Sequence, residues 1–196
     1  MRYLVYIFFF SLLIACEPSN QQPGDKFFEK GQYQKAINAY NSYLESNQAT
    51  VSILFNRGRS YEELNQWEKA LTDYESVLKI DQGNANAHVG ISTVKYEQKK
   101  YQQSLLAANK AIEINESFAE AHFMAARAKH QLGYTDSALE SYTQALALNR
   151  DFGEAFLYRG ALKISLKRNR SACEDFLKAK NLDVAGAQEA LKKYCK

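Results

Sequence analysis

The sequence predicts an all-α protein built as a solenoid of stacked antiparallel helix pairs. A similar helical segment begins every 34 residues, at Tyr33, Trp67, Tyr101, Thr135 and Asn169. A fixed period between about 20 and 50 residues is typical of arrays whose single units cannot bury their own apolar faces. Both prolines precede residue 24, so the rest of the chain is almost free of helix breakers. We therefore expect one repeat domain over residues 25–186.

About four full repeats are expected, with position 1 of each at Val51, Ala85, Ala119 and Gly153. The periodicity predicts a first helix at positions 2–14 and a second helix at positions 17–30 of each repeat. Small residues recur at positions 8 and 20, where they let two helices approach closely. Positions 4, 8 and 11 share one helical face, which we expect to be the packed stripe.

Both ends of the array depart from the full repeat. Only Asp25 to Lys30 precede the first turn at Gly31, so a partial repeat is expected at the N-terminus. Residues 187–196 form an amphipathic segment whose apolar residues, Leu191 and Tyr194 among them, can cover the last repeat. Terminal units of such arrays are usually atypical, so this segment is predicted to be a capping helix.

The first full unit carries Gly58, Tyr61, Trp67, Ala70 and Tyr74. This spacing resembles the tetratricopeptide repeat (TPR), which implies a right-handed superhelix with a concave groove lined by the first helices. Two features depart from the family pattern. Position 32 holds no proline, so the turns between repeats must end their helices in another way. Position 11 holds lysine in the last three repeats, where the family has tyrosine.

Residues 1–15 have the composition of a secretion signal, because Arg2 precedes an apolar run that is too short to span a bilayer. The run ends in Leu13-Ile14-Ala15-Cys16, which resembles the lipobox of bacterial lipoproteins. The resemblance implies a diacylglyceryl thioether and an added acyl chain, such as palmitate, on Cys16. Residues 16–24 then comprise the lipidated cysteine and a polar tether. A signal-anchor without lipidation is the alternative.

The same resemblance implies a lipid anchor in the bacterial cell envelope. Glu17, rather than Asp, follows the cysteine. In enterobacteria Asp at this position is the familiar inner-membrane retention residue, so the outer membrane, facing the periplasm, is favoured. The membrane leaflet stays open.

The sequence contains few features that would indicate catalysis, metal binding or nucleic-acid binding. The formal charge is +3 and no run of Lys or Arg concentrates it, which argues against a nucleic-acid partner. There is no G-x-S-x-G, P-loop or dinucleotide-binding motif, so we predict neither a catalytic residue nor a cofactor. None of the three histidines has a further ligand at metal-site spacing, and we expect no metal. The alternative is an envelope hydrolase or metal-binding protein that uses His122 and His130.

Cys173 and Cys195 remain after Cys16 is assigned to lipid. Their setting resembles the ending of many exported bacterial TPR proteins, which implies a disulfide that fixes the capping helix to the last repeat. Such a bridge would contribute about 3 kcal/mol by reducing the entropy of the unfolded chain. Two buried free thiols are the alternative.

Together these features predict a membrane-anchored scaffold that binds a protein or peptide partner in its concave groove. Positions 2, 9 and 13 of the first helices point away from the packed stripe. The candidate partner-binding residues lie on this side or beside it: Phe55, Asn56, Arg59, Val89, Tyr96, Phe123, Met124, Arg127, His130, Leu157 and Tyr158. An exposed apolar stripe flanked by arginines would favour a peptide with apolar anchors and some acidic residues. The alternative is that position 5 is only the edge of the core.

Overall fold

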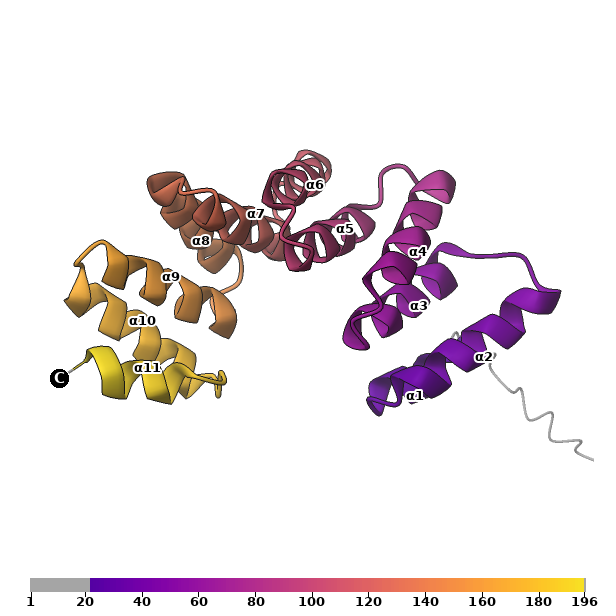
Figure 1. Cartoon of the computed structure of the whole chain (residues 1–196), viewed down its shortest axis with the longest axis horizontal. Helices are drawn as coiled ribbons and strands as arrows, with labels where there is room; N and C mark the ends of the chain where they lie inside the picture. Colours follow the sequence, from indigo (N-terminus) through magenta and orange to yellow (C-terminus); the bar gives the residue numbers. More distant parts are fainter. Residues whose placement is uncertain (1–21, 196) are drawn as a thin grey trace, which may run out of the picture.

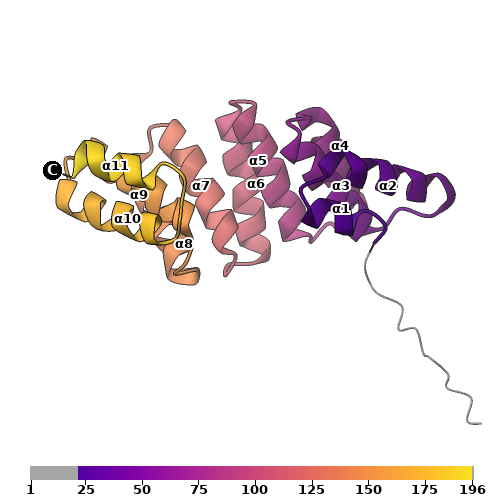
Figure 2. The ribbon, with the colours of Figure 1, turned by 90° about the horizontal axis from the view of Figure 1, so that it is seen from below.

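The computed structural model describes residues 22–195, which form eleven α-helices and no strand. The helices are α1 (Asp25–Glu29), α2 (Tyr33–Ser46), α3 (Val51–Glu63), α4 (Trp67–Ile80), α5 (Ala85–Glu97), α6 (Tyr101–Ile114), α7 (Ala119–Gln131), α8 (Thr135–Leu148), α9 (Gly153–Ser165), α10 (Asn169–Asn181) and α11 (Ala187–Tyr194). They follow one another along an arch (Figure 1), and the view from below shows them side by side in sequence order (Figure 2). The predicted solenoid of helix pairs is confirmed.

The helix boundaries repeat almost without variation. The first helices α3, α5, α7 and α9 run from position 1 to position 13, one residue earlier at each end than predicted. The second helices α4, α6 and α8 occupy positions 17–30 as predicted, and α10 ends one residue earlier. The predicted capping helix is present as α11, which begins 34 residues after α9 and so has the register of another first helix.

Each turn inside a repeat contains one residue with a left-handed backbone at position 15. These residues are Gly31, Asn65, Lys99, Gly133 and Lys167. The N–H of the following residue bonds to the carbonyl five residues earlier, as from Gln66 to Tyr61 at 2.8 Å and from Lys100 to Lys95 at 2.8 Å. This closure is the Schellman motif, and it ends the first helix of every repeat in the same way.

An Asp or Asn at position 31 ends the second helix, which explains how the repeats turn without proline. The Asp81 side chain accepts the N–H of Gly83 at 3.1 Å. The Asn115 side chain accepts that of Ser117 at 3.0 Å, and the next turn repeats the contact at Asn149. A side chain that bonds the backbone two residues on competes with helix continuation.

The aromatic side chains at position 24 are the largest buried groups of the core. Tyr74 is fully buried, and a Cβ added to Gly90 would lie 2.5 Å from its ring. Glycine is therefore needed at position 6 of the repeat that follows Tyr74. The next pair is reversed, because position 24 is Ala108 and position 6 is the buried Met124, in the same core cluster. Large and small residues thus compensate across successive repeats.

The buried face of the first helices is centred on other positions than the predicted ones. Positions 3, 8 and 10 are buried in all four full repeats, whereas His88 and His122 at position 4 are only half-buried. The lysines at position 11 are half-buried too, and the amines of Lys129 and Lys163 reach polar groups of the second helix. Lys129 donates to Ser141 Oγ at 2.9 Å. The prediction for position 8 is confirmed. Positions 4 and 11 belong to the packed face only in part, because Leu54, Phe156 and Tyr61 contact the core there, whereas the histidines and lysines are half-buried.

The C-terminal end is closed by the predicted disulfide. Cys173 of α10 and Cys195 after α11 are bonded, with their Cα atoms 5.7 Å apart. The ring of Tyr194 stacks on that of Phe176, with centroids 6.2 Å apart. The bridge and the stacked rings fix α11 against α10, and the alternative of two free thiols does not hold.

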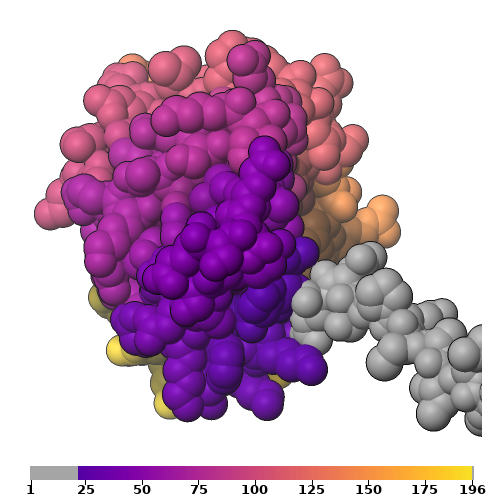
Figure 3. All heavy atoms as spheres, turned by 90° about the vertical axis from the view of Figure 1, so that its right-hand side faces the viewer, coloured from indigo at the N-terminus to yellow at the C-terminus, as the bar shows by residue number. Residues whose placement is uncertain are grey.

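The N-terminal end is covered by α1 and α2, which lie in front in Figure 3. Gly24, which the sequence placed in the tether, is buried against the Tyr40 ring and therefore belongs to the folded body. The Tyr40 hydroxyl donates to Asp25 Oδ1 at 2.6 Å. The predicted signal, Cys16 and residues 17–21 lie outside the described residues. Among residues 22–195, no helix has both the length and the apolar character needed to cross a membrane.

Candidate partner-binding groove

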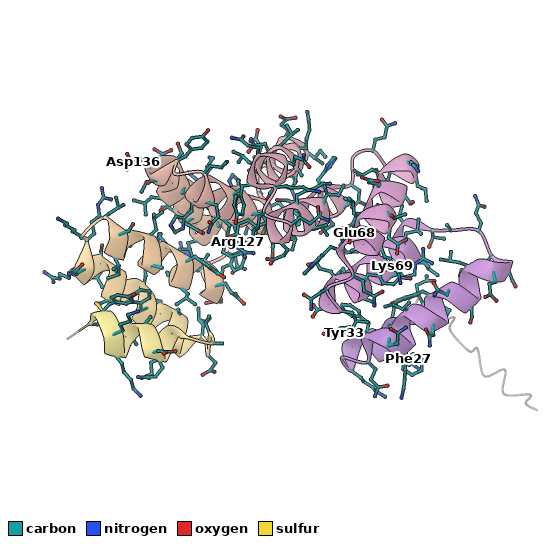
Figure 4. The ribbon with its side chains drawn as sticks, in the orientation of Figure 1. Phe27, Tyr33, Glu68, Lys69, Arg127 and Asp136 are labelled. Carbon is teal, nitrogen blue, oxygen red and sulfur yellow. A yellow bond between two sulfur atoms is a disulfide. The ribbon has the colours of Figure 1, made fainter. Side chains whose placement is uncertain are left out.

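The inner side of the arch carries the exposed residues of the first helices. Positions 2 and 13 are exposed in every full repeat, and position 9 is exposed or half-exposed, as predicted. In Figure 4, Arg127 of α7 and Tyr33 of α2 lie along this inner edge, on opposite sides of the opening of the arch.

Three adjoining hollows lie along α3 and α5. The first has a volume of about 430 Å³ and is lined by Phe55, Asn56 and Asn86, among others. The second, of about 300 Å³, shares Phe55 and Asn86 and extends to Glu62. The third, of about 290 Å³, shares Glu62 and contains the Trp67 side chain. Because neighbouring hollows share lining residues, we treat them as one surface, the α3–α5 groove.

The predicted partner-binding residues fall into three places. Phe55, Asn56, Arg59 and Val89 line the α3–α5 groove. Leu157 and Tyr158 line a separate hollow of about 350 Å³ between α9 and the segment before α11. The others lie between these hollows, and they are Tyr96, Phe123, Met124, Arg127 and His130. The candidate residues come from all four first helices, but the sequence did not distinguish those that line hollows from those that are packed between them.

Arg127 occupies the centre of an aromatic cluster. Its guanidinium carbon lies 3.9 Å from the ring centroid of Tyr96 and 5.3 Å from that of Tyr158. Its Nη2 also pairs with Glu97 Oε1 at 3.4 Å. Cation–π contacts and the ion pair hold this side chain within the protein. Arg127 therefore links α5, α7 and α9, and its charge is already neutralised by a carboxylate.

Phe123 and Met124 are buried, so the expectation of an exposed stripe is wrong at these two positions. Phe123 is 9% exposed, and its ring centroid lies 4.7 Å from that of Phe152 and 5.8 Å from that of Tyr158. Met124 is 4% exposed. Position 5 is core in this repeat, and it is half-exposed in the other three full repeats.

The histidines are held by ordinary packing contacts. Nε2 of His122 lies 2.9 Å from the carbonyl oxygen of Glu116. Burial lowers the pKa of His130 and favours its neutral form. The two residues are eight positions apart on α7, which separates them by about 12 Å along the helix, too far to share one metal ion. Within residues 22–195, no three His, Cys, Asp or Glu side chains are grouped so as to hold a metal.

The sequence reasoning missed the carboxylates of the α3–α5 groove. Glu62 accepts a hydrogen bond from the Tyr74 hydroxyl at 2.7 Å. Burial raises the pKa of Glu62 and the Tyr74 bond opposes this effect. The negative charges of Glu63 and Glu97 raise the pKa further, and the positive charge of Arg59 lowers it. The sequence does contain a pattern that could have indicated these carboxylates, because acidic residues occupy position 13 in both α3 and α5. Only the fold shows that these carboxylates face one groove.

Comparisons with known proteins agree with this architecture. Tetratricopeptide repeat models match residues 24–86 and 119–152. A crystal structure of MamA is 23% identical, with a TM-score of 0.68, over 89% of this chain and 99% of that one. TTC0263, a thermophilic TPR protein of Thermus thermophilus, is 22% identical with a TM-score of 0.70 over 87% and 92%. No curated protein sequence matches the chain.

One further solved structure bears on recognition. YrrB, described as a TPR protein with an unusual peptide-binding site, is 20% identical with a TM-score of 0.62 over 86% of this chain and 88% of that one. At these identities the likenesses establish the fold alone. Taken with the repeat models and the helix register, they show that the chain carries tetratricopeptide repeats and folds as a TPR solenoid.

Proposed function

We propose that this protein is a lipid-anchored scaffold of the bacterial envelope that holds a protein partner in its concave groove. The observation that carries the proposal is the α3–α5 groove on the inner side of a TPR solenoid. Its floor has the half-exposed apolar side chains of Phe55 and Val89, and polar and charged groups surround them. Apolar anchors inside a polar rim are typical of surfaces that bind peptides or helices.

The groove is built on rigid elements, which favours binding. Its residues come from helices that Schellman closures and side-chain caps end at fixed positions. Little side-chain and backbone freedom is then lost when a partner is bound, so more of the contact energy appears as affinity. A photo-crosslinking amino acid at Thr93 of α5 tests this use of the groove. We expect a covalent adduct with the partner in intact cells from this position.

The matched control places the same crosslinker at Asn109, which is exposed on the second helix α6. We expect no adduct there, because α6 lies outside the inner side of the arch. Adducts from Asn109 with none from Thr93 would move the binding surface to the convex side and contradict the proposed groove.

The membrane part of the proposal is supported by the resemblance of residues 13–16 to a lipobox. Two or more acyl chains on Cys16 would give stable attachment without a membrane-spanning helix. Residues 17–21, which precede the folded body, can extend to at most about 18 Å, which would keep the groove close to the membrane surface. The Cys16→Ser variant is expected to lose incorporation of labelled palmitate and to leave the membrane fraction. Unchanged labelling and fractionation of that variant would show that Cys16 is not the anchor.

A further inference from the structure

We infer that the segment held by the α3–α5 groove is basic, with Lys or Arg side chains beside apolar anchors. The inference rests on the proposed use of this groove and adds the chemistry of its occupant. Carboxylates outnumber cations on the inner positions of the first helices. The hollows of the groove are lined by Glu62, Glu63, Glu97 and Glu120 and by one cation, Arg59, and Arg127 adjoins them through its ion pair with Glu97. The whole chain carries +3, so the acidic groove is a local feature.

Both cations are already engaged by the protein. The guanidinium carbon of Arg59 lies 4.6 Å from the ring centroid of Phe28. Arg127 is paired with Glu97 and enclosed by aromatic rings. Neither Glu63 nor Glu120 has an ion-pair partner within residues 22–195. The groove therefore presents negative charge to a partner, and the expectation of an acidic ligand, which depended on free arginines, does not fit the structure.

Glu62 is the group that a cation would stabilise most. It accepts a hydrogen bond from Tyr74, and no cation lies within ion-pair distance among the described residues. Burying a carboxylate without an ion-pair partner is unfavourable, and the like charges of Glu63 and Glu97 increase that cost, while the positive charge of Arg59 reduces it. A bound ammonium or guanidinium group would relieve both effects. Burial and like charge thus make this part of the groove complementary to a cation.

The shape of the groove fits the two parts of a long basic side chain. In the 300 Å³ hollow, Phe55 and Val89 offer apolar surface for the aliphatic stem. Its charged lining residues are Glu62, Glu120 and Arg59, so carboxylates exceed cations there by one. The 290 Å³ hollow beside it combines the Trp67 ring with Glu63 and Glu97. An indole ring and carboxylates together are favourable surroundings for a cation. Two adjacent basic side chains of one segment would fill the two hollows.

The test measures fluorescence anisotropy of labelled synthetic peptides with the purified full chain in a non-ionic detergent. The first peptide alternates Leu and Phe anchors with Lys and Arg. Two matched peptides carry Gln or Glu in place of every Lys and Arg. We expect the basic peptide to bind at least about tenfold more tightly than the Gln peptide, and the Glu peptide to bind most weakly. Tighter binding of the Glu peptide, or equal binding of all three, would overturn the inference.

Variants of the protein test which carboxylates attract the basic peptide. The double variant Glu62→Gln and Glu63→Gln removes two carboxylates that line the 290 Å³ hollow and have no ion-pair partner among the described residues, and it should lower the affinity for the basic peptide at least about tenfold. The control pair Glu75→Gln and Glu140→Gln removes the same charge from exposed positions of α4 and α8 and should leave affinity unchanged. Equal losses in both pairs would mean that net charge alone attracts the peptide. Self-association of the chain that the first pair abolishes would mean that a second copy is the occupant.

The inference and the proposed function can fail separately. If Thr93 crosslinks to a partner whose bound segment is acidic or uncharged, the groove is used but the inferred charge is wrong. If Thr93 gives no adduct and none of the peptides binds, the proposed use of the groove fails as well.

Discussion

The outer full repeats differ from the middle repeats in how their two helices are joined. In α3–α4, Arg57 donates two hydrogen bonds to Asp73, at 2.8 and 2.6 Å. In α9–α10, Arg159 and Asp175 form the same pair at 2.9 and 2.7 Å. These are positions 7 and 23 in both repeats. The middle repeats hold Ile91 with Ala107 and Ala125 with Ser141 at the same positions.

Each arginine also reaches the preceding repeat. Arg57 Nη1 donates to Asn41 of α2 at 2.8 Å, and Arg159 Nη1 donates to Thr143 of α8 at 3.3 Å. Charge-assisted bonds from an arginine at position 7 therefore fix the outer repeats to their neighbours. At position 7 the middle repeats have the apolar side chains of Ile91 and Ala125, which contribute by packing. One repeat pattern is thus compatible with two kinds of helix contact, and the difference predicts how each responds to mutation.

The largest effect is expected from Arg57→Met. The change leaves the Asp73 carboxylate, whose side chain is 4% exposed, buried without its cation. Loss of one partner of a buried pair costs about 3–5 kcal/mol of unfolding free energy. Urea denaturation should show this loss. The control Ile91→Met, at the same position of a middle repeat, is expected to cost less than about 1.5 kcal/mol. Similar losses in the two variants would remove the distinction between outer and middle repeats.

The disulfide is expected to rank next, because it adds a second constraint to one outer repeat. The double variant Cys173→Ser and Cys195→Ser should lose about 3 kcal/mol through greater unfolded-state entropy. Hydrogen exchange should become faster in α10 and α11 and stay unchanged in α3 and α4. Faster exchange along the whole array would show instead that the bridge stabilises all repeats together.

Gly90→Ala tests packing by shape at the start of the middle repeats. The added methyl group would lie 2.5 Å from the Tyr74 ring, so we expect a loss of about 1–3 kcal/mol in thermal melts. Gly83→Ala is the control, because nothing lies closer than 3.6 Å to its Cβ. The double variant Gly90→Met and Tyr74→Ala copies the arrangement of Ala108 with Met124. We expect its loss of stability to be smaller than the sum of the losses in the two single variants. Simple additivity would contradict the proposed compensation.

The smallest effect concerns the groove. Because burial raises the pKa of Glu62 above 4.5, the folded state keeps its proton more strongly than the unfolded state does. The contribution of Glu62 to the free energy of unfolding is therefore most favourable at low pH, and it is lost as the pH rises through the folded-state pKa. We expect Glu62→Gln to be at least as stable as the parent at pH 7 and to depend less on pH between 4.5 and 7. Lower stability of the variant at pH 7 would show that the charge is compensated inside the protein.

The sequence predicted the fold well because a 34-residue period is a local and repeated signal. Helix boundaries, the capping helix and the Cys173–Cys195 bridge follow the prediction closely. The site was harder to predict, because burial at one position depends on residues one repeat away. Phe123 is buried by Phe152, beyond its own helix pair. The Arg–Asp pairs recur in the sequence, but their contact depends on how two helices pack.

The most direct test of the account is hydrogen exchange of the full chain with and without the basic peptide. Binding in the groove should slow exchange in α3 and α5, over residues 51–63 and 85–97, while the second helices α4 and α6 change little. The matched Gln peptide should give weaker protection at the same concentration. Protection confined to the second helices, or equal protection by both peptides, would contradict the claim that an acidic groove on the inner side of the arch binds a basic partner.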